Sequence, residues 1–299
     1  MRTRRFPCSA GLLLSLAFLA CVRLQGQEND KPLPDLDSFL PEVRKNLRSD
    51  RLLLSQYTFT EKVTIKRLDK NGKVGKTEER VYEVYPSLDE EYSYRKLVSK
   101  DGKPLSVKEL EEQDRDQDKK LEKRRRKLES MGQNKEAREA AREAEERRKE
   151  EKVLDELIKI YDIKMIGRER MAAHPAIVLS FQPRPGYTPK TDGGKILSKA
   201  AGKAWFGEDD HQLIRAETRL VDSISIGLGI IARLNEGATA VFERTRVNDE
   251  IWLPAAARFA GNIRLLLFKG LNLEVSSEYS DYRKFTVRTS VEFPSVRNQ

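Results

Sequence analysis

Tyr57-Thr58-Phe59-Thr60-Glu61-Lys62-Val63-Thr64-Ile65-Lys66 is the stretch of this 299-residue chain that decides the fold class. Tyr57, Phe59, Val63 and Ile65 fall on one side of an extended backbone, and mostly polar residues fall on the other. A period of two residues is typical of a β-strand with one buried face. Asn71-Gly72 follows, and this dipeptide favours a tight hairpin turn. We therefore expect an antiparallel neighbour directly after this strand.

Strand patterns recur along most of the chain. The returning strand carries Val81, Tyr82, Val84 and Tyr85, and a third run over 92–98 ends at the turn Asp101-Gly102. Further runs are expected at 163–165, 177–181, 204–206, 213–221, 238–246, 251–268 and 271–285. Turns or loops are expected at 173–175, 183–189, 208–211 and 248–249, a short helix at 195–201, and a short helix or a lip over the sheet at 225–234. Neighbouring strands need no parallel crossover, so we predict an α+β fold built on one large antiparallel sheet.

A helix is expected before the first strand. Residues 28–40 are polar and Pro-rich, which predicts a linker. Pro41 is suited to the first turn of a helix, and Val43, Leu47 and the leucines at 52–54 give that helix an apolar side.

The segment 108–152 interrupts the strand pattern. It holds 16 basic and 15 acidic residues among 45, with almost no Gly or Pro. Strong helix formers dominate it, so we expect an exposed helical hairpin turning near Gly132, or one long helix, with coiled-coil character. It leads into Val153, Leu154, Leu157 and Ile158, which form a stripe that faces the core.

The N-terminus predicts a secretory signal over residues 1–27. Three arginines among the first five residues precede an uncharged apolar run over 10–22, which is shorter than the roughly 20 residues of a membrane span. An uncleaved anchor helix is the alternative, and cleavage is expected near Gly26 or Gln27. The four arginines of the signal leave 53 basic against 48 acidic residues, which lowers the net charge from +9 to +5.

Both cysteines of the chain, Cys8 and Cys21, lie inside the predicted signal. The exported protein is then expected to have no disulfide, no cysteine nucleophile and no thiolate metal site. Leu19-Ala20-Cys21 leaves a second possibility, in which Cys21 is lipidated and anchors the protein, although Phe18 stands where such cleavage sites usually have leucine.

The sequence carries no catalytic signature. It lacks G-x-S-x-G, H-E-x-x-H and phosphate-loop patterns. His174 and His211 are far apart and are interpreted as surface turn residues, and Glu208-Asp209-Asp210 as a hairpin tip rather than a cation site. Gly227 and Gly229 form a G-x-G without a phosphate loop. We therefore expect no enzyme, no metal site and no cofactor.

Four stretches carry a resemblance to a known superfamily. They are 55–63 with Tyr85-Pro86, 202–206 with 213–217, 246–254, and 279–285. Together they resemble the periplasmic lipoprotein carriers and relatives that include LolA, LolB and RseB, over most of residues 40–285 except the charged segment. The resemblance implies a curved half-barrel of antiparallel strands with helices on its concave side, enclosing an apolar cavity for acyl chains. The half-barrel is expected over 41–107 and 153–299, with 108–152 as an insertion.

The same resemblance implies a periplasmic, non-enzymatic carrier or binder of lipid or lipidated protein. The candidate cavity residues lie on the apolar faces of the expected strands, where ordinary core packing is the alternative for each. A second apolar surface, around 224–231 and the run Leu265-Leu266-Leu267-Phe268, is expected to form the ligand-side wall. The candidates are Tyr57, Phe59, Val63, Ile65, Tyr82, Val84, Ile177, Leu179, Phe181, Trp205, Leu228, Ile230, Leu265 and Leu267.

The charged segment suggests a second class of function. Its net charge of +1 does not favour nucleic acid, because acids flank the basic cluster at 123–127. An envelope partner protein or an anionic membrane surface suits an exported helical arm better. The alternative hypothesis is therefore an interaction or sensor module similar to RseB, and a plain solvated arm is the simplest interpretation.

Overall fold

The computed structural model describes residues 31–47, 51–87, 93–130, 134–171, 174–226, 232–265 and 270–285. The predicted signal and both cysteines lie outside these residues, so the signal and the lipidation of Cys21 remain predictions.

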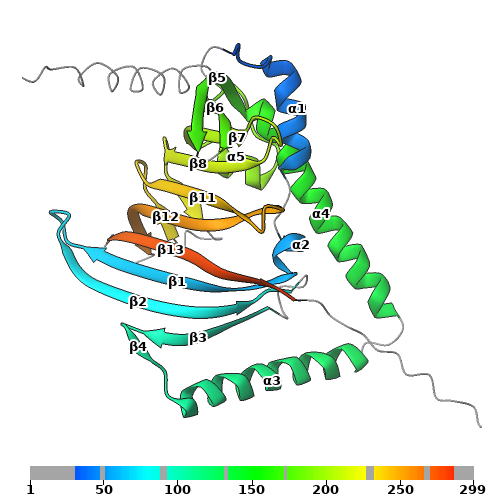
Figure 1. Cartoon of the computed structure of the whole chain (residues 1–299), viewed down its shortest axis with the longest axis vertical. Helices are drawn as coiled ribbons and strands as arrows, with labels where there is room; N and C mark the ends of the chain where they lie inside the picture. The colour runs from blue at the N-terminus through cyan, green and yellow to red at the C-terminus, as the bar shows by residue number, and fades with distance from the viewer. Residues whose placement is uncertain are drawn as a thin grey trace, which may run out of the picture.

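One sheet of 13 strands forms the body of the molecule, and every strand pair in it is antiparallel (Figure 1). The hydrogen-bonded order is β4-β3-β2-β1-β13-β12-β11-β8-β7-β6-β5, with β10 pairing both β12 and β9. The strands are β1 (Tyr57–Leu68), β2 (Val74–Tyr85), β3 (Tyr94–Lys100), β4 (Lys103–Pro104), β5 (Tyr161–Met171), β6 (His174–Pro183), β7 (Ala200–Gly207), β8 (Leu213–Leu220), β9 (Ile224–Ile226), β10 (Ala232–Leu234), β11 (Thr239–Val247), β12 (Ile251–Leu265) and β13 (Leu271–Lys284).

The first and last strands meet in the middle of the sheet. Val63 of β1 lies opposite Ser277 of β13, and Ile65 lies opposite Val275. An N-terminal meander, β1 to β4, is thereby joined to a C-terminal one, β5 to β13. Because β4 and β5 lie at opposite ends of the strand order, the sheet stays open. The predicted α+β half-barrel is confirmed.

The hairpin turns follow the local sequence. Gly72 has φ +78°, a conformation that costs glycine little. Asn248 and Asp249 have φ 52° and 54°, and the Glu250 N–H donates to the Val247 carbonyl at 3.1 Å. Positive φ at both central residues defines a type I′ turn, whose twist matches that of the flanking strands β11 and β12.

Three helices cover one face of the sheet at its β5–β8 end (Figure 1). They are α1 (Leu36–Asn46), α5 (Asp192–Leu197) and the C-terminal end of α4 (Asn134–Ile160), and a short α2 (Arg51–Leu54) precedes β1. Phe39 and Val43 of α1 pack against Ile177, Leu179, Ala204 and Phe206 in the main core. The residues between these in the strands, among them Val178 and Trp205, form a separate cluster with Trp252.

The charged segment forms two helices that diverge from each other, α3 (Val107–Ser130) and α4 (Figure 1). The alternative of one long helix was therefore wrong, whereas two helices on either side of Gly132 agree with the other alternative, although they diverge. α3 runs beside the edge strand β3, where the Gln113 side chain accepts from the Leu97 N–H at 3.0 Å and donates to the Leu97 carbonyl at 2.9 Å. α4 then leads directly into β5 at the other end of the sheet, where its C-terminal end lies beside α5.

Several local predictions were wrong. α1 begins at Leu36, because the Asp35 carboxylate caps the helix by accepting a hydrogen bond from the Ser38 N–H at 2.9 Å, and because Phe39 is buried in the core. Residues 36–40 are therefore helix and not linker, and Pro41 lies inside the helix. His174 and Pro175 begin β6 rather than a turn. The short helix is Asp192–Leu197 instead of 195–201, since Thr191 caps it and β7 begins at Ala200. Within 225–234 the described residues belong to β9 and β10, not to a helix.

Candidate apolar binding site

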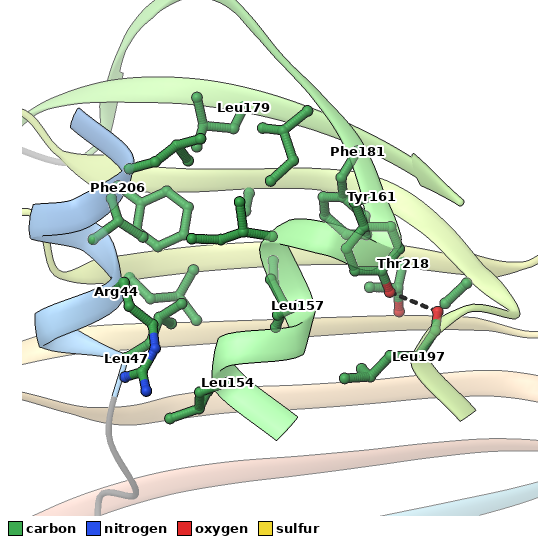
Figure 2. Close-up of a pocket in the computed structure, with 18 of the residues that line it drawn as sticks. Arg44, Leu47, Leu154, Leu157, Tyr161, Leu179, Phe181, Leu197, Phe206 and Thr218 are labelled. Carbon is green, nitrogen blue, oxygen red and sulfur yellow. Dashed lines mark hydrogen bonds between the residues drawn. The ribbon is translucent and has the colours of Figure 1, made fainter. Parts of the chain in front are cut away.

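A cavity of about 280 Å³ lies between the covered face of the sheet and the three helices; we call it the roofed cavity (Figure 2). Its floor is made by side chains of β6, β7 and β8, among them Leu179, Phe206 and Ala216. α1 contributes Leu40, Val43, Arg44 and Leu47; α4 contributes Leu154, Leu157 and Ile158; α5 contributes Ile196 and Leu197. Nearly all of these groups are hydrocarbon, so the cavity suits an apolar ligand.

The periodicities of the surrounding elements produce this lining. In β6, Leu179 and Phe181 point to the cavity, and the intervening residues point away. In α4, Leu154, Leu157 and Ile158 recur at the spacing that places residues on one side of a helix. Leu40, Val43 and Leu47 do the same in α1. The apolar faces of strands, in which every second residue points the same way, thus lie across the cavity from the apolar sides of helices.

Arg44 is the charged residue of this lining, and it joins α1 to α4 at the rim. Its Nη2 lies 2.7 Å from Asp155 Oδ1 and 2.5 Å from Glu151 Oε2. The hydrogen bonds that Arg44 donates to Glu151 and then to Asp155 raise the pKa of Arg44 above its ordinary value. Figure 2 shows Arg44 and Leu47 on α1, facing Leu154 and Leu157 on α4. Because the guanidinium is neutralised by these two acids, it leaves the cavity without a net cationic centre.

The other side of the cavity is closed by Tyr161. Its hydroxyl donates to the Leu197 carbonyl at 2.6 Å, the contact drawn as a dashed line in Figure 2. Tyr161 is 3% exposed, and burial raises the pKa of its phenol. The phenol therefore stays neutral and fixes the C-terminal end of α5 against the start of β5.

Glu156 anchors α5 from beneath. Its carboxylate is buried, and it accepts hydrogen bonds from the Lys190 N–H, the Thr191 N–H at 3.0 Å, the Thr191 hydroxyl and the Tyr187 hydroxyl at 3.2 Å. These bonds, the one from Lys190 first, lower the pKa of Glu156 to about 2. Gly194 leaves space for the carboxylate, since a Cβ there would lie 2.4 Å from Glu156 Oε2. The carboxylate thus sets the position of the α5 wall.

A second hollow of about 270 Å³ continues along the same face of the sheet; we call it the open trough. It shares Ala216 and Thr218 with the roofed cavity, and it continues over Ala240 and Phe242 of β11, Ala257 and Phe259 of β12, and Val275 and Ser277 of β13. Only strands contribute to its lining, so it has no helical cover from the described part of the chain.

The structure separates the residues that the sequence proposed for the cavity. Leu179 and Phe181 line the roofed cavity, and Ile177 is buried in the adjoining core. Val63 and Ile65 lie on the same sheet face but beyond the open trough, across from Ser277 and Val275. Trp205 lies on the opposite face, where its indole N–H donates to Glu169 Oε2 at 2.8 Å, so its assignment to the cavity was wrong.

The remaining candidates lie elsewhere. Tyr57 and Phe59 pack edge-on or tilted against Tyr282 near the end of β13. Tyr82 stacks under the Arg95 guanidinium, and Val84 pairs with Phe59 on the β2 side of the sheet. Leu228, Ile230 and Leu267 lie outside the described residues, as does the side chain of Leu265. Ile224, from the apolar surface expected as the ligand-side wall, does line the roofed cavity.

The sequence interpretation missed the helical half of the site. Leu40 was assigned to the linker, Val43 and Leu47 to a helix but not to a cavity, and Leu154, Leu157 and Ile158 to the core. The signal in the sequence was the apolar stripe at 153–158. Which strands this stripe would face depends on the sheet order, and the local sequence does not encode that order.

The described ranges contain neither a metal-binding cluster nor a membrane-spanning helix. No cluster of three or more His, Cys, Asp or Glu side chains there could hold a metal ion. No helix within those ranges has the length and apolar character needed to cross a membrane. His211 lies in the turn between β7 and β8, as predicted, and its ring lies beside Phe39. His174 lies in β6 instead of a turn, and its ring packs edge-on against Trp252.

No protein-family model and no curated protein matches the chain. Solved structures with a similar fold include a LolA superfamily protein from Nitrosomonas europaea, with 10% identity over 86% of this chain and 96% of that one, at a TM-score of 0.30. An outer membrane lipoprotein-sorting domain from Vibrio parahaemolyticus has 11% identity over 84% and 93%, at 0.29. The MucA/MucB complex from Pseudomonas aeruginosa gives 12% identity over 85% and 100%, at 0.23.

Proposed function

We propose that this chain is an exported, non-enzymatic binder of lipid or of lipidated protein, and that an acyl chain occupies the roofed cavity. The observation that carries the proposal is the hydrocarbon lining, which comes from both the sheet and the helices that cover it. Apolar burial contributes about 0.8 kcal/mol per methylene, so a chain of moderate length supplies micromolar affinity without any polar contact. The N-terminal sequence supports export, and the periplasm is the compartment that we propose.

Filling the roofed cavity tests this proposal. Leu157 lies on α4 and faces the cavity, so Leu157→Trp places a larger side chain where the ligand would lie. We expect binding of a fluorescent fatty acid to weaken on the order of tenfold, because about two methylenes of the ligand, at ~0.8 kcal/mol each, are no longer buried in the cavity. Lipid that co-purifies with the protein, measured by mass spectrometry, should fall in parallel.

Ile166→Trp is the matched control. Ile166 is 48% exposed and lies at the irregularity of β5 between Met165 and Gly167, away from the cavity. This variant should bind like the wild type. Equal binding by the wild type and Leu157→Trp would contradict the proposal, as would a wild type that binds no fatty acid.

A second candidate function is a partner-binding or sensor module that uses the charged helices. It is favoured by the contrast within α4, in which the helix is exposed through most of 141–152 whereas its last two turns form the cavity wall. A partner that contacts the exposed part would therefore lie directly beside the ligand site.

Site-specific photo-crosslinking in the periplasm distinguishes this candidate. A photoreactive residue in place of Arg148, on exposed α4, should give one discrete cross-linked protein. The same residue in place of Lys164, on the exposed side of β5, should not. No product at Arg148, or the same product at both positions, would count against a partner-binding arm.

A further inference from the structure

The roofed cavity and the open trough are continuous along the sheet. Ala216 and Thr218 of β8 belong to the lining of both. In the strand register Ala216 lies opposite Phe242, and Thr218 lies opposite Ala240, so the trough begins on the next strand, β11, without an intervening element.

Small side chains form the floor at this junction. Ala204 of β7 pairs with Ala216, and Thr218 pairs with Ala240. Phe242 lies opposite Ala216 and beside this path, and Phe259 of β12 lies one strand farther from the roofed cavity, opposite Ala240. Small residues alone would have no special meaning, but here they lie at the place where two separately formed hollows meet.

The two hollows differ in cover. α1, α4 and α5 lie over the first, whereas the second is lined by β8, β11, β12 and β13 alone. Ala240 is exposed, and Phe242 and Phe259 are half-buried, so apolar surface remains accessible there. From β8 to β13 the trough crosses three strand spacings, about 14 Å. A chain that starts under the helices has an apolar path of that length ahead of it.

We infer that the ligand is a straight alkyl chain that passes from the roofed cavity into the open trough, and that Ala216 and Thr218 set the length of chain the protein accepts. This inference rests on the proposed function, because it assumes that the roofed cavity holds the first part of the chain. The junction is then a specificity determinant, because a large residue there stops the chain from entering the open trough.

The test compares octanoate, laurate and palmitate by isothermal titration calorimetry, each below its micelle-forming concentration. For the wild type, affinity should increase from octanoate to palmitate, by up to about fourfold per methylene, the equivalent of about 0.8 kcal/mol. Thr218→Phe should remove the gain of affinity from octanoate to palmitate. Ala240→Phe, which lies outside the lining of the roofed cavity, should bind octanoate like the wild type and gain little from the longer chains, and it has space to fold because Ala240 is exposed.

Two substitutions serve as controls. Thr218→Val keeps the size of the side chain and should retain the full dependence on chain length. Thr64→Phe introduces the same bulk on the opposite face of β1, since Thr64 alternates with Val63 and Ile65, and should also behave like the wild type.

The outcomes separate the inference from the proposed function. If octanoate binds the wild type and palmitate binds no tighter, the passage into the trough is wrong and the roofed cavity remains the ligand site. If Thr218→Phe and Ala240→Phe keep the wild-type dependence on chain length, the junction does not set the length of chain that the protein accepts. If no fatty acid binds the wild type, the proposed function fails as well.

Discussion

At the scale of single residues, Glu156 shows how a charge is accommodated beside an apolar cavity. It is 5% exposed, yet it has no cationic partner among its hydrogen bonds, which come from two backbone N–H groups and two hydroxyls. Bonds of this kind stabilise the ionised carboxylate relative to the protonated one. The same carboxylate ties the 187–191 loop and the N-terminus of α5 to α4, so the cavity wall depends on its charge.

This arrangement predicts a specific dependence of stability on pH. Because the folded-state pKa of Glu156, about 2, is below its ordinary value of 4.5, its stabilising contribution is complete above pH 4.5 and is lost as the pH falls towards 2. Glu156→Gln places an amide NH₂ among hydrogen-bond donors, so the variant should melt at a lower temperature at neutral pH. Its melting temperature should also change less than that of the wild type over this acidic range, as measured by thermal unfolding at several pH values.

Glu150→Gln on the exposed side of α4 is the control, and it should follow the wild type throughout. A wild-type curve that runs parallel to that of Glu156→Gln from pH 4.5 to 2 would show that Glu156 does not contribute as described.

At the scale of elements, α3 acts as a cap on an edge strand. An exposed edge presents unpaired backbone groups that invite pairing with another chain. The Gln113 amide bonds to both backbone groups of Leu97, as a neighbouring strand would. Asp114 adds bonds from the Tyr94 hydroxyl at 2.9 Å and from Lys96 Nζ at 2.7 Å. A charged helix can thus protect a sheet edge with side chains alone.

Removing this cap should expose the β3 edge. Gln113→Ala leaves the Leu97 N–H and carbonyl without their side-chain partner, so we expect a loss of about 1–2 kcal/mol of stability. Hydrogen exchange at the Leu97 amide should accelerate, and the variant should self-associate at high concentration.

Glu112→Ala, at an exposed position of the same helix, should change neither the exchange rate nor the oligomeric state. If hydrogen exchange at the Leu97 amide is unchanged in Gln113→Ala, α3 does not protect this edge.

At the scale of the whole molecule, the charged segment links the two ends of an open sheet. β4 and β5 are consecutive in the chain but lie ten strand spacings apart in the sheet, about 48 Å along its surface. α3 and α4 have 24 and 27 residues, or about 36 and 40 Å of helix, which is enough to make this crossing. The segment is thus the connection that the strand order requires.

The strands, most turns, the helix before β1 and the helices of the charged segment follow from local patterns in the sequence. Alternation at 57–66, Asn-Gly and Asn-Asp turns, and helix formers at 108–152 act over a few residues, so they can be read directly. The start of α1 was missed because Pro41 was placed in the first turn of the helix, whereas the helix begins at Leu36 and buries Phe39 one turn earlier. In β7, alternation gives two faces, and the sequence does not say that Ala204 rather than Trp205 faces the cavity.

The sequence alone therefore determined the elements and the antiparallel class of the sheet, because period and turn chemistry are local. Only the tertiary structure decided that β1 pairs with β13, that α4 closes a cavity over β6–β8, and that a trough continues from it. Those features depend on contacts between residues far apart in the chain, such as Arg44 with Asp155 and Ile65 with Val275. Such pairings are set by the burial of complementary apolar faces, which many sequences satisfy and no short motif records.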